Sequence, residues 1–289
     1  MIGDSNMRLG GGIIKPYNDP ITWMERVKEL GYSAVTCPVN NDASKEEIAT
    51  YCEIAKQNDV IISEVGAWSN PLSRCDDERK TAIEHNKKQL ALADEVGANC
   101  CVNISGSRGE VWDGCYHDNY SEETYALIID TTREIIDAVK PVRTFYTLEP
   151  MPWMHPDSPE DYLQLMKDID RPAFAVHLDY ANMVNSVEKY LNLSDFIRHC
   201  YKYLGPYIKS IHAKDVILNN KRLPCNIDEV APGKGIADYG LILKLTHELG
   251  DDTPLMTEHM STHEEYYDAT KYIRNIGEQK GINIKGRLP

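Results

Sequence analysis

Short runs of apolar and β-branched residues alternate with longer amphipathic runs along the chain, and the alternation repeats eight times. Short apolar runs bounded by turn residues predict buried strands, whereas apolar residues at helical spacing predict helices. The predicted strands are Arg8–Ile14, Tyr32–Val39, Val60–Trp68, Ala98–Ser105, Thr144–Pro150, Phe174–Asp179, Ile208–Lys214 and Pro254–His259. The predicted helices are Ile21–Leu30, Lys45–Gln57, Asp77–Val96, Glu122–Val139, Pro159–Ile169, Leu193–Leu204, Tyr239–Leu249 and His263–Gln279. A polar insertion from about Leu218 to Ala237 separates the seventh strand from its helix.

Strands that alternate with helices pair in parallel through right-handed crossovers. Eight such units in 289 residues predict an α/β fold, a single (β/α)8 TIM barrel that takes up residues 1–289 as one domain. An open doubly wound sheet would show the same alternation. That fold binds dinucleotides through a GxGxxG turn after its first strand, and no such motif follows the first predicted strand. The barrel is therefore the preferred architecture.

The composition narrows the classes of function. Lys and Arg number 31 and Asp and Glu 45, and the net charge of −14 argues against a nucleic-acid partner. No apolar run approaches the ~20 residues of a membrane-spanning helix, and Met1–Asn6 lack the basic and apolar regions of a signal peptide. The eight cysteines are scattered without a CxxC pair, so we expect a reducing, cytoplasmic location. The 17 Tyr and 4 Trp carry polar handles, which predicts half-wet positions such as a pocket rim.

Polar side chains gather where the last four predicted strands end. In a TIM barrel the active site lies at the carboxyl ends of the strands, so these side chains are expected at one rim. The fifth strand ends with Glu149, the sixth with His177 and Asp179, the seventh with His212, Lys214 and Asp215, and the eighth with Glu258 and His259. Four consecutive strands thus deliver a carboxylate or an imidazole to the same place.

Several carboxylates buried near one another repel, and each is costly to bury alone. A divalent cation removes this conflict. Glu149, Asp179, His212 and Glu258 form an oxygen and nitrogen donor set without thiolate, which suits Mn²⁺, Mg²⁺, Co²⁺ or Zn²⁺ and leaves positions open for a substrate. A single strand-end residue of this kind is more often a cap or part of an ion pair. Four on consecutive strands favour a shared metal site.

With these residues the chain resembles the xylose-isomerase-like TIM-barrel superfamily, and within it the sugar phosphate isomerase/epimerase family that includes ketose 3-epimerases. The resemblance runs over nearly the whole chain. Its most specific parts are Glu149, Asp179, the motif His212-Ala213-Lys214-Asp215, the turn Pro232-Gly233-Lys234-Gly235 with Asp238, and Glu258. The resemblance implies one divalent metal ion, usually Mn²⁺, bound by Glu149, Asp179, His212 and Glu258, with Glu149 and Glu258 as the acid/base pair.

The reaction implied by this resemblance is chemically coherent. A ketose or keto-sugar would chelate the metal through its carbonyl and a neighbouring hydroxyl, and the metal would stabilise the enediolate formed when the α-proton leaves. Glu149 and Glu258, on opposite walls, could reach opposite faces of that carbon, one removing the proton and the other returning it. This predicts a metal-dependent sugar isomerase or epimerase of carbohydrate metabolism.

Further residues near the predicted mouth are candidates for substrate binding. Lys214 and His177 point into the barrel, because each lies two residues from a predicted ligand on its strand. Trp153 and His155, in the loop after the fifth strand, suit sugar stacking and hydroxyl recognition. The other candidates at the rim are Trp68, Asn103, Arg108 and Trp112. Each has a structural alternative: a core histidine for His177, a neutralising charge for Lys214, a solvated side chain for Arg108.

The sixth strand departs from the family pattern. Many relatives carry Asp-x-x-His there, and that His contacts metal or substrate, whereas here the fourth position is Asn182. Asn can hydrogen-bond a sugar hydroxyl, which makes Asn182 a further substrate-binding candidate, but it is a poor metal ligand and no base. The change also argues against the DNA-repair branch of the superfamily, the apurinic endonucleases, which need a multi-zinc site rich in His.

Two other functions stay open. The barrel and its ligands also resemble inosose dehydratase and the metal subunit of lyases that cleave 3-oxo-glycosides, in which the same intermediate expels a β-substituent. A metal-binding barrel that serves as a non-catalytic partner subunit is the second alternative. The expected partners are a small sugar or keto-sugar substrate and, for assembly, a second copy of the chain or a small accessory subunit.

Overall fold

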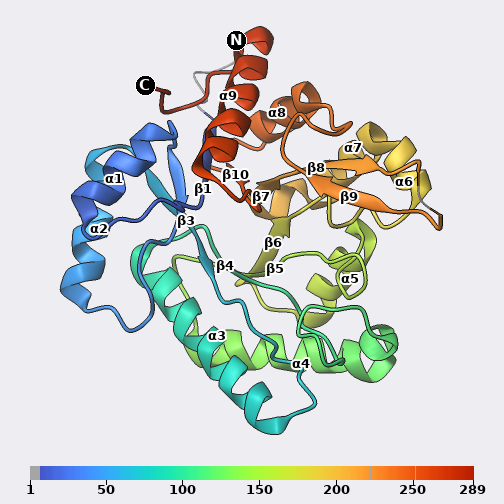
Figure 1. Ribbon diagram of the computed structural model, residues 1–289. Helices are drawn as coiled ribbons and strands as arrows, with labels where there is room; N and C mark the ends of the chain where they lie inside the picture. The colour runs from blue at the N-terminus through green and yellow to red at the C-terminus, as the bar shows by residue number, and fades with distance from the viewer. Residues whose placement is uncertain (1–6, 222, 251) are drawn as a thin grey trace.

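The computed structural model describes residues 7–221, 223–250 and 252–289, and Figure 1 traces their course. Met1–Asn6, on which the expectation of no signal peptide rests, lie outside this described part. The strands are β1 Arg8–Gly11, β2 Ala34–Thr36, β3 Ile61–Gly66, β4 Cys100–Asn103, β5 Tyr146–Leu148, β6 Phe174–Leu178, β7 Ile208–Ala213, β8 Asp215–Leu218, β9 Ile227–Val230 and β10 Pro254–Thr257. The α-helices are α1 Pro20–Glu29, α2 Lys45–Gln57, α3 Asp76–Val96, α4 Glu122–Val139, α5 Pro159–Ile169, α6 Val187–Leu191, α7 Leu193–Leu204, α8 Tyr239–Glu248 and α9 His263–Lys280. Two short 3-10 helices, η1 His117–Tyr120 and η2 Gly205–Tyr207, complete the described elements.

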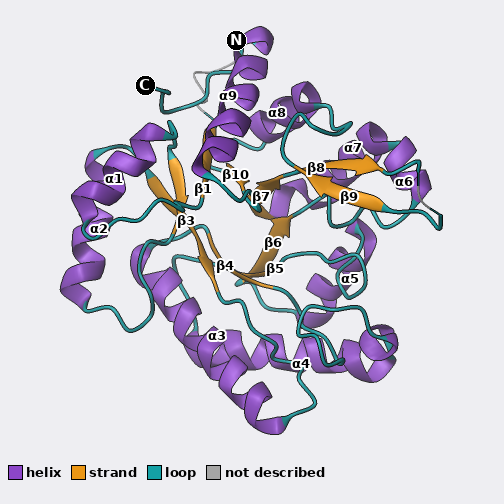
Figure 2. Cartoon of the chain, in the orientation of Figure 1, coloured by secondary structure: helices purple, strands orange, loops and turns teal. Residues whose placement is uncertain are grey.

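Eight strands close into a barrel in the order β1-β10-β7-β6-β5-β4-β3-β2, and every neighbouring pair is parallel. Helices surround the ring of strands on its outside (Figure 2). This confirms the predicted TIM barrel. Within the described residues, no helix combines the length and the apolar character needed to cross a membrane.

Helix positions agree with the prediction more closely than strand positions do. The helices α2, α4, α5 and α7 have the predicted bounds, and Ser44, Ser121 and Ser158 accept a hydrogen bond at the amino ends of the first three. The strands are shorter than predicted; β5, for example, has three residues where Thr144–Pro150 was expected. Apolar residues beyond the ladder still pack between strands and helices, so hydrophobicity alone does not mark where pairing ends.

Buried tyrosines tie strand ends to helices, while other tyrosines of the described residues, Tyr120 and Tyr125 among them, are partly exposed as expected. Tyr146, Tyr162, Tyr180 and Tyr239 are at most 1% exposed. The hydroxyl of Tyr162, on α5, donates to the carbonyl of Leu148 at 2.7 Å. A buried phenol needs such a partner. Tyr162, Tyr180 and Tyr239 donate to backbone carbonyls next to strand ends, and Tyr146 donates to the side-chain oxygen of Asn86.

The polar insertion after β7 folds as an antiparallel hairpin, β8–β9, which the sequence pattern did not predict. Figure 2 shows it as two strands outside the ring of the barrel. Its base is held by Asp215, whose carboxylate accepts hydrogen bonds from the backbone N–H groups of Gly233, Gly235 and Ala237 at 3.1, 3.0 and 2.8 Å. Gly235 has no space for a side chain, because a Cβ there would lie 2.3 Å from Oδ1 of Asp215.

Arg8, which is 5% exposed at the start of β1, organises the amino-terminal end of the barrel. Its guanidinium donates to the carbonyls of Ser33 and Asp59 at 3.1 and 2.7 Å, and to the carboxylates of Asp59 and Asp252 at 2.9 and 2.5 Å. One side chain thus joins loops from distant parts of the sequence at the end of the barrel opposite the predicted site.

Candidate metal centre and active site

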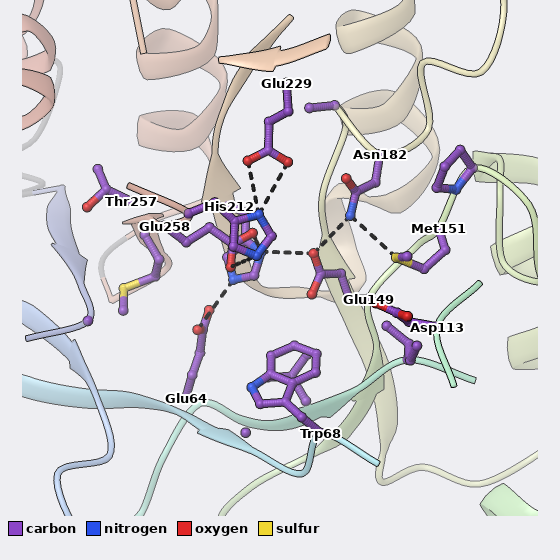
Figure 3. A pocket seen from close by; sticks show the side chains of 18 of the residues that line it. Glu64, Trp68, Asp113, Glu149, Met151, Asn182, His212, Glu229, Thr257 and Glu258 are labelled. Carbon is purple, nitrogen blue, oxygen red and sulfur yellow. Dashed lines mark hydrogen bonds and ion pairs between the residues drawn. The ribbon is translucent and has the colours of Figure 1, made fainter. Parts of the chain in front are cut away.

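Four predicted metal ligands come together at the carboxyl ends of neighbouring strands. Glu149, Asp179 and Glu258 directly follow β5, β6 and β10, and His212 lies near the end of β7, paired in register with Met256 of β10. One ligand atom from each of the four side chains lies within 4.8 Å of the others. Figure 3 shows Glu149 and Glu258 on either side of His212. The cluster has the donor atoms and the spacing that could hold a metal ion.

His212 lies at the centre of this cluster and is 2% exposed. Its Nδ1 lies 3.2 Å from Oε1 of Glu149, 3.5 Å from Oδ2 of Asp179 and 2.8 Å from Oε1 of Glu258. Burial by itself lowers the pKa of His212, but the surrounding carboxylates outweigh burial and raise it well above its ordinary value. Because Nδ1 faces all three carboxylates, it is the nitrogen directed at the predicted metal position.

Lys214 is a second buried cation in the cluster, 1% exposed. Its Nζ lies 2.7 Å from Oδ2 of Asp179 and 3.5 Å from Oε1 of Glu149, and it also contacts Glu258. Although burial opposes the charged form, these carboxylates raise the pKa of Lys214 well above its ordinary value. Its carbonyl accepts hydrogen bonds from the hydroxyls of Tyr180 and Tyr239 at 2.5 and 2.9 Å, which fixes the backbone that carries the side chain.

Two of the carboxylates, those of Asp179 and Glu258, are held in their ionised form. Burial would raise their pKa values, but His212 and Lys214 lower the pKa of Glu258 to about 2 and hold that of Asp179 well below its usual range. Oδ2 of Asp179 and Oε1 of Glu258 are buried and take part in no well-aligned hydrogen bond, although both lie in ion-pair contact with the two cations. Ionised oxygens directed into a shared centre without hydrogen-bond partners are suited to ligate a divalent cation, so the residues present fit the implied metal.

The sequence did not point to Glu64, which lies in the middle of β3 and is 2% exposed. It reaches across the barrel to β6 and β7: Oε1 lies 3.1 Å from Nε2 of His177 and accepts from the hydroxyl of Ser210, and Oε2 lies 3.6 Å from Nε2 of His212. Burial would raise the pKa of Glu64, but the charge of His212 and hydrogen bonds from both histidines hold it far below its usual range. The sequence signal that could have revealed Glu64 is a carboxylate in the middle of an otherwise mostly apolar strand.

A cavity of about 1230 Å³ opens above the cluster. Its lining includes Glu149, His212 and Glu258 as well as the three predicted tryptophans of the mouth, Trp68, Trp112 and Trp153. The tryptophans are 44%, 39% and 36% exposed, so part of each ring is free to contact a ligand. The indole N–H of Trp153 donates to the carbonyl of Asp113 at 2.8 Å, which joins two loops of the rim. Half-exposed rings around a polar floor suit a ligand with both hydroxyls and apolar surface.

Asn182 also lines the cavity and is bound to a predicted catalytic residue. Its side-chain amide donates to Oε1 of Glu149 at 3.0 Å and contacts Sδ of Met151 at 3.7 Å. Its backbone N–H donates to Oδ1 of Asp179 at 2.9 Å, so the turn after β6 orients one predicted ligand while the side chain orients another.

The hairpin β8–β9 contributes Glu229, a cavity-lining residue that the sequence did not identify. Oε2 of Glu229 lies 3.3 Å from Nζ of Lys214, and Oε1 lies 3.0 Å from Nδ1 of His259. His259 adopts a left-handed backbone conformation with φ of 58°, which is uncommon for a residue other than glycine. Figure 3 shows Glu229 approaching the cluster from the side opposite Glu64.

Four predicted substrate-binding residues lie elsewhere. The amide of Asn103 bonds Ser69 and Asn86, and Arg108 donates to the carbonyl of Leu72 at 2.7 Å. Nδ1 of His155 lies 2.8 Å from Asp161, and His177 is completely buried against Glu64. None of these four is among the residues that line the described cavity. The position of a residue near a strand end does not reveal whether its side chain faces the cavity or is hydrogen-bonded to neighbouring protein groups.

The family assignment follows from the sequence as a whole. Residues 24–276 match the family described as Xylose isomerase-like TIM barrel, and because this region covers most of the chain, the protein belongs to that family. This confirms the resemblance stated from the strand-end residues. A search of curated proteins found no match.

Solved structures with the same fold include a magnesium complex, an epimerase and a probable dehydratase. One is a xylose isomerase-like TIM barrel protein from Mycobacterium smegmatis in complex with magnesium. It shares 18% identity, the match covers 97% of this chain and 95% of that chain, and the TM-score is 0.66. A D-psicose 3-epimerase from Clostridium cellulolyticum H10, solved with D-tagatose, shares 16% identity with coverages of 93% and 99% and a TM-score of 0.66. The "probable 3-DHS dehydratase AsbF" from Bacillus anthracis shares 16% identity with coverages of 93% and 99% and a TM-score of 0.70. At these identities the matches establish the fold.

Proposed function

We propose that the protein is a divalent-metal-dependent isomerase or epimerase that moves a proton on the carbon next to the carbonyl of a sugar or keto-sugar. The observation that carries this proposal is the arrangement of Glu149 and Glu258 around His212 in the floor of a large cavity. The two glutamates follow β5 and β10, which are separated by β6 and β7 in the ring of strands. Two carboxylates on facing walls are what proton transfer at opposite faces of one carbon requires.

Glu149, Asp179, His212 and Glu258 would hold the metal. The oxygen and nitrogen donors suit Mn²⁺ best among the candidates, with Mg²⁺, Co²⁺ and Zn²⁺ as alternatives, and the fold neighbour from M. smegmatis was solved with magnesium. When bound, the metal would act as a Lewis acid that polarises the sugar carbonyl and stabilises the negative charge developing on its oxygen.

The side chains around the metal position have separate tasks in this proposal. One glutamate in its ionised form removes the proton next to the carbonyl, and the other, after taking up a proton from water, delivers it to the opposite face, which inverts the carbon. Lys214, placed between Asp179 and Glu258, keeps these carboxylates ionised and offers its ammonium N–H groups to a substrate oxygen. Asn182 fixes the rotamer of Glu149 through the amide hydrogen bond at 3.0 Å. The half-exposed tryptophans would stack against the sugar and exclude water.

A lyase or dehydratase acting on keto-sugars is the second candidate. Removal of the same proton by one glutamate leaves an electron pair that can form a C=C bond and break the bond to a β-substituent. The departing oxygen then takes up the removed proton from that same glutamate, so water or an alcohol leaves and the atoms balance without a further reactant. Two observations favour this candidate: Asn182, a residue that is no base, stands where many relatives have His, and the cavity of about 1230 Å³ has room for more than a monosaccharide.

A substrate panel in D₂O tests the proposal and separates the two candidates. Metal-loaded protein is incubated with ketohexoses and with 3-oxo-glycosides, and the products are followed by NMR and mass spectrometry. Deuterium in a retained, isomerised sugar supports the isomerase or epimerase. Release of an aglycone or of water supports the lyase. No exchange and no product with any member of the panel, from protein that has bound its metal, contradicts the proposed chemistry.

A further inference from the structure

The carboxylate of Glu64 is divided between two environments. Oε1 accepts the hydroxyl of Ser210 and lies 3.1 Å from Nε2 of His177, so this oxygen is already engaged. Oε2 faces Nε2 of His212 at 3.6 Å, and no other described cation is in ion-pair contact with it. In Figure 3, Glu64 meets the ring of His212 from below, on the side away from Glu149 and Glu258. A buried carboxylate thus lies at the back of the predicted metal-binding imidazole.

We propose that Glu64 is a positioning residue for the metal centre: it keeps the proton of His212 on Nε2 and the lone pair of Nδ1 directed at Glu149, Asp179 and Glu258. The inference rests on the metal site of the proposed function and adds to it a residue from β3, a strand that supplies none of the four ligands.

The physical reason lies in the two nitrogens of an imidazole. A histidine that binds a metal through one nitrogen must carry its proton on the other, and a carboxylate at that second nitrogen fixes both the tautomer and the ring orientation. In His212, Nδ1 faces the three ligand carboxylates and Nε2 faces Glu64, so the two roles are already assigned by position. The negative charge of Glu64 also increases the electron density that Nδ1 offers to a metal.

The neighbours of Glu64 restrict any movement of this pair. The ring of His177 packs edge-to-face against that of His212, with centroids 4.1 Å apart and an interplanar angle of 76°. His177 and Ser210 lie opposite one another in the β6–β7 register, so both partners of Oε1 stand on strands of the barrel wall. Glu64, His177, Ser210 and His212 are each at most 2% exposed. Glu64 and His212 are therefore shielded from solvent and held between strands of the barrel wall, as a positioning contact requires.

Glu64, His177 and His212 could also be regarded as ligands of a second metal, because their donor atoms lie close together. Two features favour the positioning role. Oε1 of Glu64 already has two hydrogen-bond partners, and His177 is completely buried and does not line the cavity that Glu64 and His212 line. A second metal would need these hydrogen bonds to break. The number of ions bound per chain is consequently part of the test.

The test compares Co²⁺ and Mn²⁺ binding by the wild-type chain and by Glu64→Gln, which removes the charge and retains the shape. Affinity is measured by calorimetric titration, and the visible spectrum of the Co²⁺ form reports the geometry around the ion. Loss of a partner to a ligand histidine typically weakens metal binding by about 10–100-fold, and we expect Glu64→Gln to lie in that range with a changed Co²⁺ spectrum. Glu134→Gln, at an exposed ion pair with Lys87, is the matched control and should bind like wild type.

Several outcomes would overturn the inference. A folded Glu64→Gln chain that binds both ions with wild-type affinity and an unchanged Co²⁺ spectrum contradicts it, as does a wild-type chain with two ions of which the variant loses one. If Glu64→Gln does not fold, Ser210→Ala takes its place, because the hydroxyl of Ser210 donates its hydrogen bond to Glu64 and not to His212. Weaker binding by Ser210→Ala supports the inference, and unchanged binding contradicts it. A wild-type chain that binds neither ion is a different result, since it overturns the proposed function itself.

Discussion

The side-chain amide of Asn182 donates a hydrogen bond to Oε1 of Glu149 at 3.0 Å, and this contact joins the turn after β6 to the predicted base on β5. Asn182 is a poor metal ligand and no base, so its contribution to the site is the orientation of a neighbouring carboxylate.

Replacement of Asn182 by Ala should therefore lower turnover. A hydrogen bond to a charged group contributes roughly 1.5–3 kcal/mol, so we expect kcat/KM to fall by about 10–100-fold. Steady-state kinetics on the substrate found in the D₂O panel measures this. Asn185→Ala is a suitable control, because Asn185 also borders the cavity but its side-chain amide bonds Pro152 and Lys189 and no carboxylate of the cluster. Equal losses in both variants would contradict a specific role for Asn182.

Lys214→Met should destabilise the metal-free protein. The lysine is 1% exposed and touches Asp179, Glu149 and Glu258, so its removal leaves these three carboxylates with His212 as their remaining buried counter-charge. Breaking a buried pair of this kind costs about 3–5 kcal/mol, measurable by chemical denaturation after chelation of metal. Added Mn²⁺ should restore part of the loss. Lys244→Met, at an exposed pair with Glu248, should change stability little, and an unaltered Lys214→Met chain would refute the assigned charge balance.

The ion pair between Arg8 and Asp59, at the end of the barrel opposite the site, predicts that stability depends on pH. The hydrogen bond from Arg8 holds the pKa of Asp59 below its ordinary value, so the folded state binds the proton more weakly than the unfolded state. This contribution to stability is complete above about pH 4 and disappears as the pH falls through the folded-state pKa. Because Asp59 is 64% exposed, the effect should stay below about 1 kcal/mol.

Asp59→Asn should accordingly be less stable than wild type at pH 7 and indistinguishable from it at pH 2, in thermal unfolding followed by circular dichroism. Asp170→Asn is the matched control, because Asp170 also has a left-handed backbone, with φ of 50° against 52° for Asp59. A difference between wild type and Asp59→Asn that persists unchanged at pH 2 would rule out titration of Asp59 as its source.

The hairpin β8–β9 should loosen when Glu229 is shortened. Glu229→Ala removes the contacts with Lys214 and His259, which tie the hairpin to the cluster. Hydrogen–deuterium exchange should then rise in residues 215–230 and stay unchanged in the barrel strands. Asp228→Ala provides the comparison, since Asp228 accepts from Asn226 within the same hairpin. Identical exchange in both variants would show that Glu229 does not hold the hairpin.

Much of the fold could be predicted because each unit carries its own signals. Ser121 and Ser158 cap α4 and α5, and the alternation of runs fixed the order of strands and helices. The hairpin escaped prediction because its second strand, Ile227–Val230, has no buried residue, so no hydrophobic pattern marks it. Its pairing depends on Asp215, which binds backbone groups about 20 residues further along.

The sequence predicted which residues lie at the strand ends that form the site. It did not predict which neighbouring side chains those residues contact. Glu149 and Glu258 lie together because parallel strands end at one rim. Glu64 lies in mid-strand and acts across the barrel, and the alternation of residues along β3 does not reveal what it faces. His155 follows a predicted ligand by six residues, yet its ring is bound to Asp161 and packed against Tyr120 and Tyr125.

The measurement that tests the central claim most directly is metal analysis of three proteins: the wild-type chain, Glu149→Gln and His212→Ala. Each is stripped with chelator, dialysed against Mn²⁺ and analysed for bound metal by mass spectrometry, with circular dichroism to verify folding. We expect one Mn²⁺ per wild-type chain and a substantial loss in both folded variants. A wild-type chain that retains no divalent metal, or variants that retain it as firmly as wild type, would contradict the account.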